Sequence, residues 1–378
     1  MIKKIENNFI KDKMCRKIFS LLNKESDTSR FVGGCVRDSI LGIETNDIDI
    51  ATKLEPKEVS KILLSESIKV IPTGLDHGTV SVFSKKLNFE ITTLRSDIET
   101  DGRHAKVIFS DSWKIDASRR DFTINSIAIS LNKKDKGEII DLYGGIDDLK
   151  NGIIKTPKDP EITFYDDPLR MMRAIRFASQ LNFKIKDSNI EIIKNEKQRI
   201  NIISKERINE ELNKILLSPK PSIGFILLKN TGLLEIIIPE LIQLEGIDEI
   251  EGKTHKDNFY HTLQVLDNIC KNTDNLWLRW VALLHDIGKP KTKRYIKKKG
   301  WSFHGHEYVG SKMVFKIFKR LKLPLNHKLN YVKKLVLLSS RPVILSSDEI
   351  TDSAVRRLIF DAGDDIDELM TLCEADIT

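Results

Sequence analysis

Cysteine is scarce in this sequence and follows no pattern typical of a disulfide framework or a zinc site. Four cysteines occur in 378 residues, at positions 15, 35, 270 and 373, and none of them forms a C-x-x-C pair. This distribution argues against a disulfide scaffold and against a thiolate zinc knuckle, and it is typical of proteins in a reducing compartment.

Long apolar runs are also missing. The N-terminal stretch MIKKIENNFIKDKMCRKIF interrupts its apolar residues with lysine and aspartate, so it lacks the core of a signal peptide. No apolar run approaches the roughly 20 residues that a membrane-spanning helix needs. The expected location is therefore the cytoplasm, with no membrane partner.

A strong excess of one charge is absent as well. Lysine and arginine number 62 against 55 acidic residues, which gives a formal net charge of +7. Such a surplus permits a polyanionic partner without requiring one, because many solvated surfaces carry it. With 40% hydrophobic and 31% charged residues the chain is not disordered, and its length predicts two or three domains.

The pattern of apolar residues changes along the chain from mixed to helical. In the first 150 residues we expect helices at 1–30 and 35–41 and strands at 30–32, 46–52, 68–71, 79–83, 88–94, 106–109 and 126–131. After about residue 160 helical spacing dominates, as at 166–183 and at 204–217, where Ser204 is the expected N-cap. The chain ends inside a helical pattern, which suggests that a longer protein continues beyond it.

Gly33 and Gly34 lie between an expected strand and an expected helix. Glycines at such a turn allow a phosphate to approach backbone N–H groups, and the start of the helix adds positive partial charge. Arg37 could add a full charge at the same place. The alternative is a plain tight turn, which is about as common.

Two carboxylates follow, at Asp47 and Asp49, with Ile48 between them. Residues two apart in a strand point to one face, and two like charges so close favour a bound cation. Glu90 lies in another expected strand, which could bring it beside the pair. Three carboxylates could hold two Mg²⁺ ions about 4 Å apart. The alternative is a solvated strand face, which the nearby Gly-Gly turn makes the weaker interpretation.

Four ordered motifs resemble a known family. They are FVGGCVRD at 31–38, NDIDIAT at 46–52, RRDFTIN at 119–125 and DPLRMMRAIRF at 167–177. Together they resemble the class II tRNA nucleotidyltransferases, which are the bacterial CCA-adding enzymes and their poly(A) polymerase relatives. The resemblance covers essentially the whole chain.

The resemblance implies an α+β protein with a polymerase-beta-like nucleotidyltransferase head, a mixed sheet with helices, at 1–155. A helical neck for base recognition and RNA binding would follow at 156–250, and a helical HD domain at 251–378. The implied reaction is addition of C and A nucleotides to the tRNA 3′ end from CTP and ATP, with Asp47, Asp49 and Glu90 catalytic. Whether the protein is a monomer or a homodimer stays open.

Asp167 and Arg170 lie three residues apart on an expected helix, with Arg173 one step further. Cytosine and adenine each present an amino donor beside a ring-nitrogen acceptor, so an Asp–Arg pair can match both bases. Guanine and uracil would leave polar groups unpaired, at about 1–3 kcal/mol each. An ordinary salt-bridged helix is the alternative. The family resemblance implies the nucleotide-reading role and adds Arg176, whereas Asp166 stands where the family usually has Glu.

The motif at 119–125 supplies further expected nucleotide contacts. Arg120 can neutralise triphosphate charge, and by resemblance Asp121 and Asn125 contact the sugar or organise the turn. Without the family context, a charged strand entry is an equally good interpretation.

Histidines and acids recur in the C-terminal half in the manner of an HD domain. They are His261, His285-Asp286, His304, His306 and Asp376, of which His261, His285, Asp286 and Asp376 are the expected ligands. Imidazole with carboxylate suits Ni, Mn, Fe or Zn. By resemblance this module is associated with phosphohydrolase activity on nucleotides or cyclic phosphates. The alternative is a helical RNA-binding body that has kept the motif as structure.

Other functions remain open at this stage. The enzyme could add only A, only CC or a poly(A) tail, or it could be an HD phosphohydrolase with a degenerate first half. A non-catalytic RNA-binding protein would not need the acidic pair, and signal-type uridylyltransferases usually begin with a Gly-Ser turn that is absent here. The basic run 289–299, followed by Trp301 and Phe303, could contact RNA or be a solvated loop.

Overall fold

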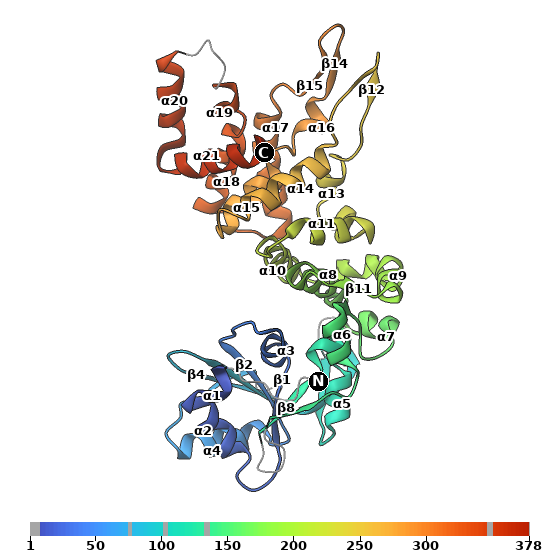
Figure 1. The fold of residues 1–378 in the computed structure, drawn as a ribbon, viewed down its shortest axis with the longest axis vertical. Coiled ribbons are helices and arrows are strands. Elements are labelled where there is room, and N and C mark those ends of the chain that lie inside the picture. The colour runs from blue at the N-terminus through green and yellow to red at the C-terminus, as the bar shows by residue number, and fades with distance from the viewer. Residues whose placement is uncertain (1–7, 75–77, 101–104, 132–136, 346–350, 378) are drawn as a thin grey trace. The chain divides into compact units, whose positions relative to one another are not determined.

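A computed structural model describes residues 8–74, 78–100, 105–131, 137–345 and 351–377. The chain divides into two compact units (Figure 1). The first unit comprises Met1–Arg170 with Lys184–Ile192, and the second comprises Met171–Phe183 with Ile193–Thr378. The first is α+β and the second is largely helical, which confirms the expected fold class.

The first unit is built on a seven-stranded sheet in the order β3-β4-β5-β2-β1-β8-β9. Its strands are β1 (Ser29–Val32), β2 (Asp47–Thr52), β3 (Ile71–Gly74), β4 (Thr79–Phe83), β5 (Asn88–Thr93), β8 (Ala128–Ser130) and β9 (Glu138–Ile140). Neighbouring strands are antiparallel except β2 and β5, which are parallel. Strands β6 (Arg95–Thr100) and β7 (Ala105–Phe109) form a separate hairpin.

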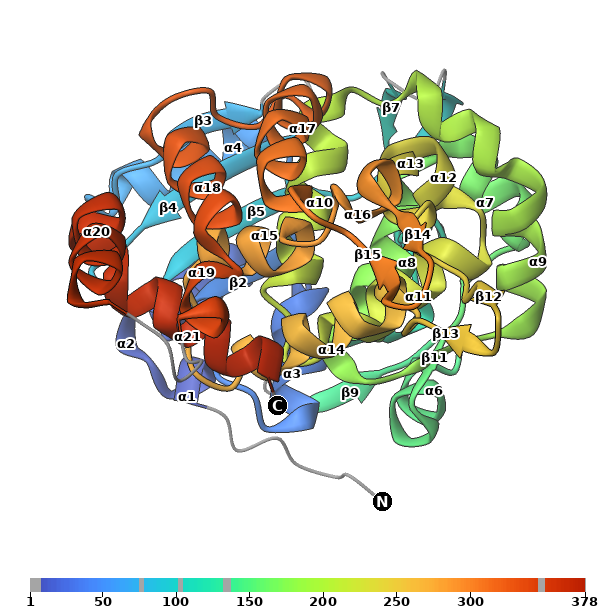
Figure 2. The ribbon, with the colours of Figure 1, turned by 90° about the horizontal axis from the view of Figure 1, so that it is seen from above.

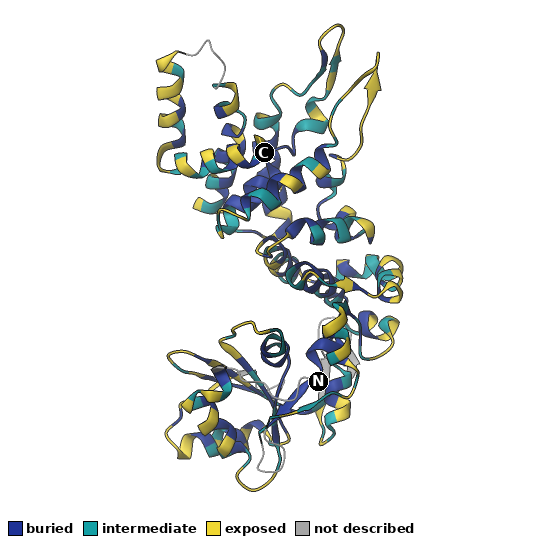
Figure 3. Ribbon diagram, viewed as in Figure 1, coloured by how far each residue is buried: buried dark blue, intermediate teal, exposed yellow. Residues whose placement is uncertain are grey.

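Strands β2 and β5 have one face that is buried throughout. Ile48, Ile50, Phe89 and Ile91 are each at most 1% exposed, and they alternate with polar residues on the other face. Figure 3 shows buried residues both in the sheet of the first unit and in the helices of the second. Burial of one face fixes the register of a strand, because a slip of one residue would expose every apolar side chain.

Helices α1–α6 accompany the sheet of the first unit. They are α1 (Asn8–Lys11), α2 (Lys13–Leu22), α3 (Gly34–Leu41), α4 (Pro56–Ser65), α5 (Trp113–Ser118) and α6 (Gly145–Asn151). Helix α2 contacts β1, where Phe19 stacks on Phe31 with ring centroids 4.6 Å apart. A short 3₁₀ turn, η2 (Thr123–Asn125), lies between α5 and β8.

The expected elements of the first unit differ from the observed ones mainly at their ends. Of the expected helix 1–30, residues 1–7 lie outside the described residues, and α2 already ends at Leu22. There the Asn23 side chain donates to the Phe19 carbonyl and accepts from Thr28, which turns the chain into β1. The strand expected at 68–71 is β3 at Ile71–Gly74, and β6 and β9 were not predicted.

Helices α7–α13 lead from the sheet into the second unit. They are α7 (Pro160–Asp166), α8 (Leu169–Leu181), α9 (Asp187–Glu196), α10 (Lys205–Leu216), α11 (Pro221–Asn230), α12 (Leu233–Ile237) and α13 (Pro239–Ile242), with β10 (Ile153–Ile154), β11 (Lys184–Ile185) and η3 (Lys197–Ile202) among them. The expected helix 166–183 begins only at Leu169, because Pro168 disfavours helical backbone before it. Ser204 accepts from Arg207 N–H, which confirms the expected cap of α10.

The C-terminal part of the second unit packs around buried helices. Its helices are α14 (Asn258–Ile269), α15 (Leu276–Leu284), α16 (Lys289–Thr292), α17 (His306–Leu321), α18 (His327–Leu338), α19 (Arg341–Ile344), α20 (Asp352–Ala362) and α21 (Ile366–Ile377), with η4 (Gly363–Asp365). Helix α14 contacts α15 and α21, and α15 contacts α18 (Figure 2). Two hairpins that were not predicted, β12 (Glu249–Ile250) with β13 (Lys253–Thr254) and β14 (Arg294–Ile296) with β15 (Gly300–Ser302), contact each other through β13 and β15.

None of the helices in the described residues combines the length and the apolar character that crossing a membrane requires.

The buried face of β5 generates a stability prediction. Phe89 is fully buried, whereas Phe83 on the adjacent strand β4 is 57% exposed. Phe89→Ala should lower the free energy of unfolding by about 3–5 kcal/mol, because it removes buried area and leaves a cavity. Phe83→Ala, the matched control, should change it by less than about 0.5 kcal/mol. Urea denaturation measures both, and equal losses would contradict the burial described here.

Candidate functional site

Three acids meet on the polar face of β2 and β5. Asp49 pairs with Glu90 in the parallel register, and Asp47 pairs with Asn88 two residues earlier in each strand. Asp47 and Asp49 point to the same face because they are two residues apart in one strand. The structure therefore brings together the three acids expected from the sequence. The face is open at Asp47 and Glu90, which are exposed, and half-buried at Asp49.

The Gly-Gly turn lies directly against Asp49. Gly33 has φ +74° and ψ −142°, a backbone conformation that is almost restricted to glycine. A Cβ on Gly33 would lie 2.8 Å from Asp49 Oδ2 and 3.4 Å from Arg120 Nη1. The Gly34 N–H donates to the Asp49 carboxylate. Any side chain at position 33 would therefore fill the space between the backbone, the acid and the arginine.

The ionisation of Asp49 reflects this crowding. Burial raises the pKa of Asp49 to about 6, and the neighbouring Glu90 and Asp47 charges add to the rise, against the lowering influence of Arg120 and the Gly34 N–H. A carboxylate that is costly to ionise alone is stabilised in its charged form by a cation. The three acids offer carboxylate oxygens, which are donors that Mg²⁺ prefers.

The predicted nucleotide contacts around η2 form a connected network. Arg37 is buried and donates to both oxygens of Asp38 and to Asn125 Oδ1 at 2.9 Å. Asn125 in turn donates to Asp121 Oδ1 at 2.9 Å. Arg37 thus ties helix α3 to the 3₁₀ turn. Its expected contribution to phosphate binding, like the sugar contacts of Asp121 and Asn125, stays a prediction.

Asp167 and Arg170 lie at the start of α8. Asp167 Oδ1 accepts from Leu169 N–H at 3.1 Å, and Arg170 Nη2 donates to the Arg119 carbonyl at 2.8 Å. The contact with Arg119 was not predicted, because nothing in the sequence relates the two positions. The base-reading role of the pair stays a prediction.

Arg173 and Arg176 lie further along α8, in the second unit. Arg176 is buried, stacks over Phe177 and donates to Glu211 of α10 at 2.6 Å. Arg173 lies 5.5 Å from the Phe177 ring. The ion pair of Arg176 gives it a structural contact that the sequence did not predict, and the nucleotide contacts of both arginines stay predictions.

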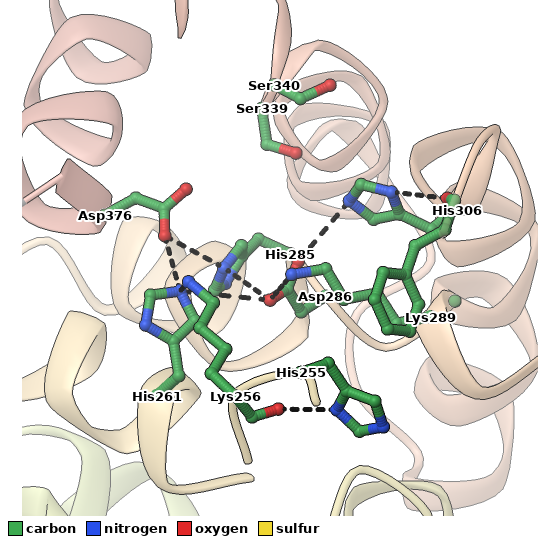
Figure 4. Close-up of polar contacts among 12 residues, drawn as sticks. His255, Lys256, His261, His285, Asp286, Lys289, His306, Ser339, Ser340 and Asp376 are labelled. Atoms are coloured by element: carbon green, nitrogen blue, oxygen red, sulfur yellow. Dashed lines mark hydrogen bonds and ion pairs between the residues drawn. The ribbon is translucent and has the colours of Figure 1, made fainter. Parts of the chain in front are cut away.

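A second cluster lies in the second unit, where four expected residues meet (Figure 4). His261 comes from α14, His285 and Asp286 from the end of α15, and Asp376 from α21. His261 Nε2 lies 2.7 Å from Asp376 Oδ1, and His285 Nε2 lies 3.4 Å from Asp286 Oδ2. In the described part of the chain, one group of at least three His, Cys, Asp or Glu residues has ligand atoms that all lie within 4.8 Å of one another. It consists of His261, His285 and Asp286.

The orientation of His285 suits a metal ligand. Its Nδ1 contacts the Ala282 carbonyl at 2.8 Å, which leaves Nε2 directed into the cluster. That buried Nε2 lies 3.4 Å from Asp286 Oδ2 and 3.7 Å from Asp376 Oδ1. Burial alone would raise the pKa of Asp286, but His285, His306 and Lys289 outweigh it and hold that pKa well below its ordinary value. An ionised acid beside an imidazole nitrogen that faces it fits a divalent metal.

Three basic side chains border this cluster that were not among the expected ligands. His306 Nε2 lies 3.4 Å from Asp286 Oδ1, Lys289 Nζ lies 2.5 Å from Asp286 Oδ2, and Lys256 Nζ lies 2.8 Å from His261 Nε2. Lys289 follows Asp286 by three residues, a spacing that could have revealed it. His304, also noted in the sequence, is exposed.

The raised pKa of Asp49 gives a pH prediction. The folded state binds a proton at Asp49 more tightly than the unfolded state, so the contribution of this group to stability falls as pH rises from its ordinary pKa of 3.8 to about 6. Asp49→Asn removes this pH-dependent contribution to stability, because an amide does not bind the proton. Urea denaturation in a metal chelator should show the variant gaining stability relative to the parent across that window. Parallel pH curves for the two proteins would contradict the prediction.

Comparisons with known proteins agree with this architecture. The Poly A polymerase head domain matches residues 29–155, a probable RNA-binding and SrmB-binding site of polymerase A matches 182–244, and the HD domain matches 258–378. The Bacillus stearothermophilus CCA-adding enzyme, whose structure was solved in complex with CTP, is 27% identical with a TM-score of 0.69. That similarity covers 98% of this chain and 79% of the other.

Curated relatives from lactobacilli are closer in sequence. The Ligilactobacillus salivarius CCA-adding enzyme is 44% identical over 196 residues, which is 51% of this chain and about half (46%) of that protein. The Lactobacillus helveticus CCA-adding enzyme is 38% identical over 294 residues, which is 76% of this chain and 68% of that protein. The three domain models match in order, and the acids lie beside the glycine turn as the motifs predict. On these grounds the chain belongs to the family of CCA-adding enzymes.

Proposed function

We propose that this protein adds C and A nucleotides to the 3′ end of tRNA from CTP and ATP, without a nucleic-acid template, and releases pyrophosphate. The observation that carries the proposal is the parallel register that sets Asp49 beside Glu90, next to the turn at Gly33. The names of the relatives, and the CTP complex of the Bacillus stearothermophilus enzyme, support these substrates.

The acids of the first unit are suited to hold a divalent cation, as the family implies. Asp47 and Asp49 would hold Mg²⁺, with Glu90 beside them, because the set offers oxygen donors alone and Asp49 is costly to ionise without a partner. When bound, the metal supplies charge neutralisation at the phosphate that is transferred. The fit rests on the chemistry of the donors and on the crowding at Asp49.

The protein's own groups position the nucleotide in this proposal. Without a side chain at Gly33, the backbone can approach a triphosphate closely beside Arg120, whose Nη1 lies 3.4 Å from where a Cβ would be. A guanidinium there neutralises triphosphate charge and orients it, and positioning together with charge neutralisation provides most of the catalysis in phosphoryl transfer. Asp121 and Asn125 would contact or support the sugar, and Arg37 holds their turn in place.

Base selection is assigned to the start of α8. Asp167 would accept a hydrogen bond from the exocyclic amino group, and Arg170 would donate to the ring nitrogen of cytosine or adenine. Guanine and uracil would meet each partner with the wrong polarity. Arg173 and Arg176 complete the set by family resemblance. The same chemistry would serve an A-adding, CC-adding or poly(A)-adding enzyme, which differ in their products.

Incubation with tRNA transcripts tests this function. Transcripts that end in the discriminator base, in C or in CC are supplied with each NTP singly and together, and the products are resolved on a gel. The parent should complete CCA on all three, and addition limited to A, limited to CC, or running to a long A tail would identify the alternatives. No incorporation would refute the proposal.

Asp47→Asn should lower incorporation by at least about 10³-fold, because it removes one of the charges that the cation requires. It keeps the size of the side chain, so the fold should persist in circular dichroism and thermal denaturation. Glu44→Gln is the matched control, since Glu44 is an exposed acid on the loop just before β2. Near-normal activity of Asp47→Asn would remove Asp47 from the site.

A second activity is favoured by the cluster in the second unit. The convergence of two imidazoles and two carboxylates supports a divalent metal (Ni, Mn, Fe or Zn) held by His261, His285, Asp286 and Asp376. The activity proposed for this site is hydrolysis of a phosphate ester, for which a 2′,3′-cyclic nucleotide is the probe. When bound, the metal supplies Lewis-acid activation there.

His285→Asn should abolish metal binding at this cluster in calorimetric titrations with Mn²⁺, Ni²⁺ and Zn²⁺, and hydrolysis with it. CMP and AMP incorporation should persist, because the acids of the first unit are unchanged. The control is His304→Asn, which alters an exposed histidine two residues before His306. Unchanged metal binding by His285→Asn would contradict the assignment of this site.

A further inference from the structure

One buried carboxylate in the first unit holds two consecutive arginines. Asp116, on α5, is 3% exposed. Its Oδ1 accepts from Arg119 Nε at 2.8 Å, and its Oδ2 accepts from Arg120 Nη2 at 3.0 Å and from Arg120 Nε at 3.3 Å. A single acid therefore orients both guanidinium groups. The sequence motifs and the comparisons assign no role to Asp116.

Asp116 contacts one edge of the Arg120 guanidinium, so the opposite edge is the one that can contact a nucleotide. A guanidinium offers its donors in a rigid planar fork. Asp116 takes the Nε and Nη2 edge, which leaves Nη1 directed toward Gly33, 3.4 Å from the place where a Cβ would lie. Asp49 lies at the same place and is close enough to raise the pKa of Arg120. The ion pair thus aims the remaining edge of Arg120 into the proposed triphosphate site.

Arg119 links the same carboxylate to the base-reading residue. Its guanidinium is held by Asp116, and its backbone carbonyl accepts from Arg170 Nη2 at 2.8 Å. Arg119 is also the C-cap residue of α5, so its backbone position depends on how that helix ends. A change at Asp116 would therefore reach Arg120 through the side chain and Arg170 through the backbone.

We propose that Asp116 is a positioning residue that aims Arg120 at the triphosphate and, through Arg119, sets Arg170 for discrimination of the base. This inference rests on the proposed nucleotidyl transfer. It differs from a purely structural ion pair in one respect. A structural pair would affect stability alone, whereas a positioning pair changes nucleotide affinity and base selection.

Asp116→Asn tests the proposal, because it keeps the size of the side chain but replaces one acceptor with a donor that faces a guanidinium. We expect KM and Kd for CTP and ATP to rise on the order of 10- to 100-fold, since small misplacements of a binding group cost that much. Incorporation of UMP and GMP relative to CMP and AMP should also increase. Steady-state kinetics on tRNA and equilibrium dialysis with labelled nucleotides provide these numbers.

The matched control is Asp27→Asn. Asp27 pairs with Arg30 at 3.1 Å in the same unit, so its loss removes an Asp–Arg pair that the proposal does not connect with the nucleotide. Asp27→Asn should leave KM, Kd and base selection unchanged. Asp116→Asn with lowered stability but parental Kd and base selection would overturn the proposal.

Asp116→Glu tests the positioning role of Asp116 if Asp116→Asn does not fold. It retains the charge that a structural role needs and moves the carboxylate by one methylene, so we expect an intermediate rise in Kd and KM. Parental values in a folded Asp116→Glu protein would overturn the proposal. Dialysis reports nucleotide binding without catalysis, so a parent protein that binds CTP but does not extend tRNA would refute the proposed function and still test Asp116.

Discussion

The parallel pairing of β2 with β5 is the constraint on which the first unit depends. It sets Asp49 opposite Glu90 on one face, while Ile48, Ile50 and Phe89 lie buried on the other. The apolar face secures the acids indirectly, because a slip of one residue would exchange the two faces and bury the charges. Packing thus holds like charges at a separation that they would not adopt alone. The raised pKa of Asp49 reflects the electrostatic cost of that arrangement.

In both units an acid lies beside basic side chains, but the basic side chains differ between the units. In the first unit Asp49 has Arg120 nearby, and Arg120 is itself held by Asp116. In the second unit Asp286 has imidazoles and Lys289 around it. Gly288 approaches the His306 carbonyl so closely that a side chain at position 288 would not fit between α16 and α17. Oxygen donors alone suit a hard cation, whereas mixed imidazole and carboxylate donors suit transition metals. One chain thus carries two clusters of polar side chains that differ in their donor atoms.

Much of this organisation could be predicted from the sequence because its signals are local. The alternation at 47–52 and 88–93 predicted the strands, and the spacing of Asp47 and Asp49 predicted their shared face. Contacts between distant positions could not be predicted. Asn125 accepts from Arg37 across 88 residues of sequence, and Arg170 donates to a backbone carbonyl, which any residue type offers. The hairpins at 249–254 and 294–302 were missed because strands of two or three residues are too short to show alternation.

The way in which Glu90 reaches Asp49 has a consequence for how this protein can vary between lineages. Hydrogen bonds between β2 and β5 align the two acids, and β4 pairs with β5 on its other side, whereas the loops that join α4, β3 and β4 take no part in this alignment. Loops in that crossover can therefore lengthen, shorten or change composition at little thermodynamic cost. Natural selection is then free to reshape the edge of the sheet while the pairing of Asp49 with Glu90 stays unaltered.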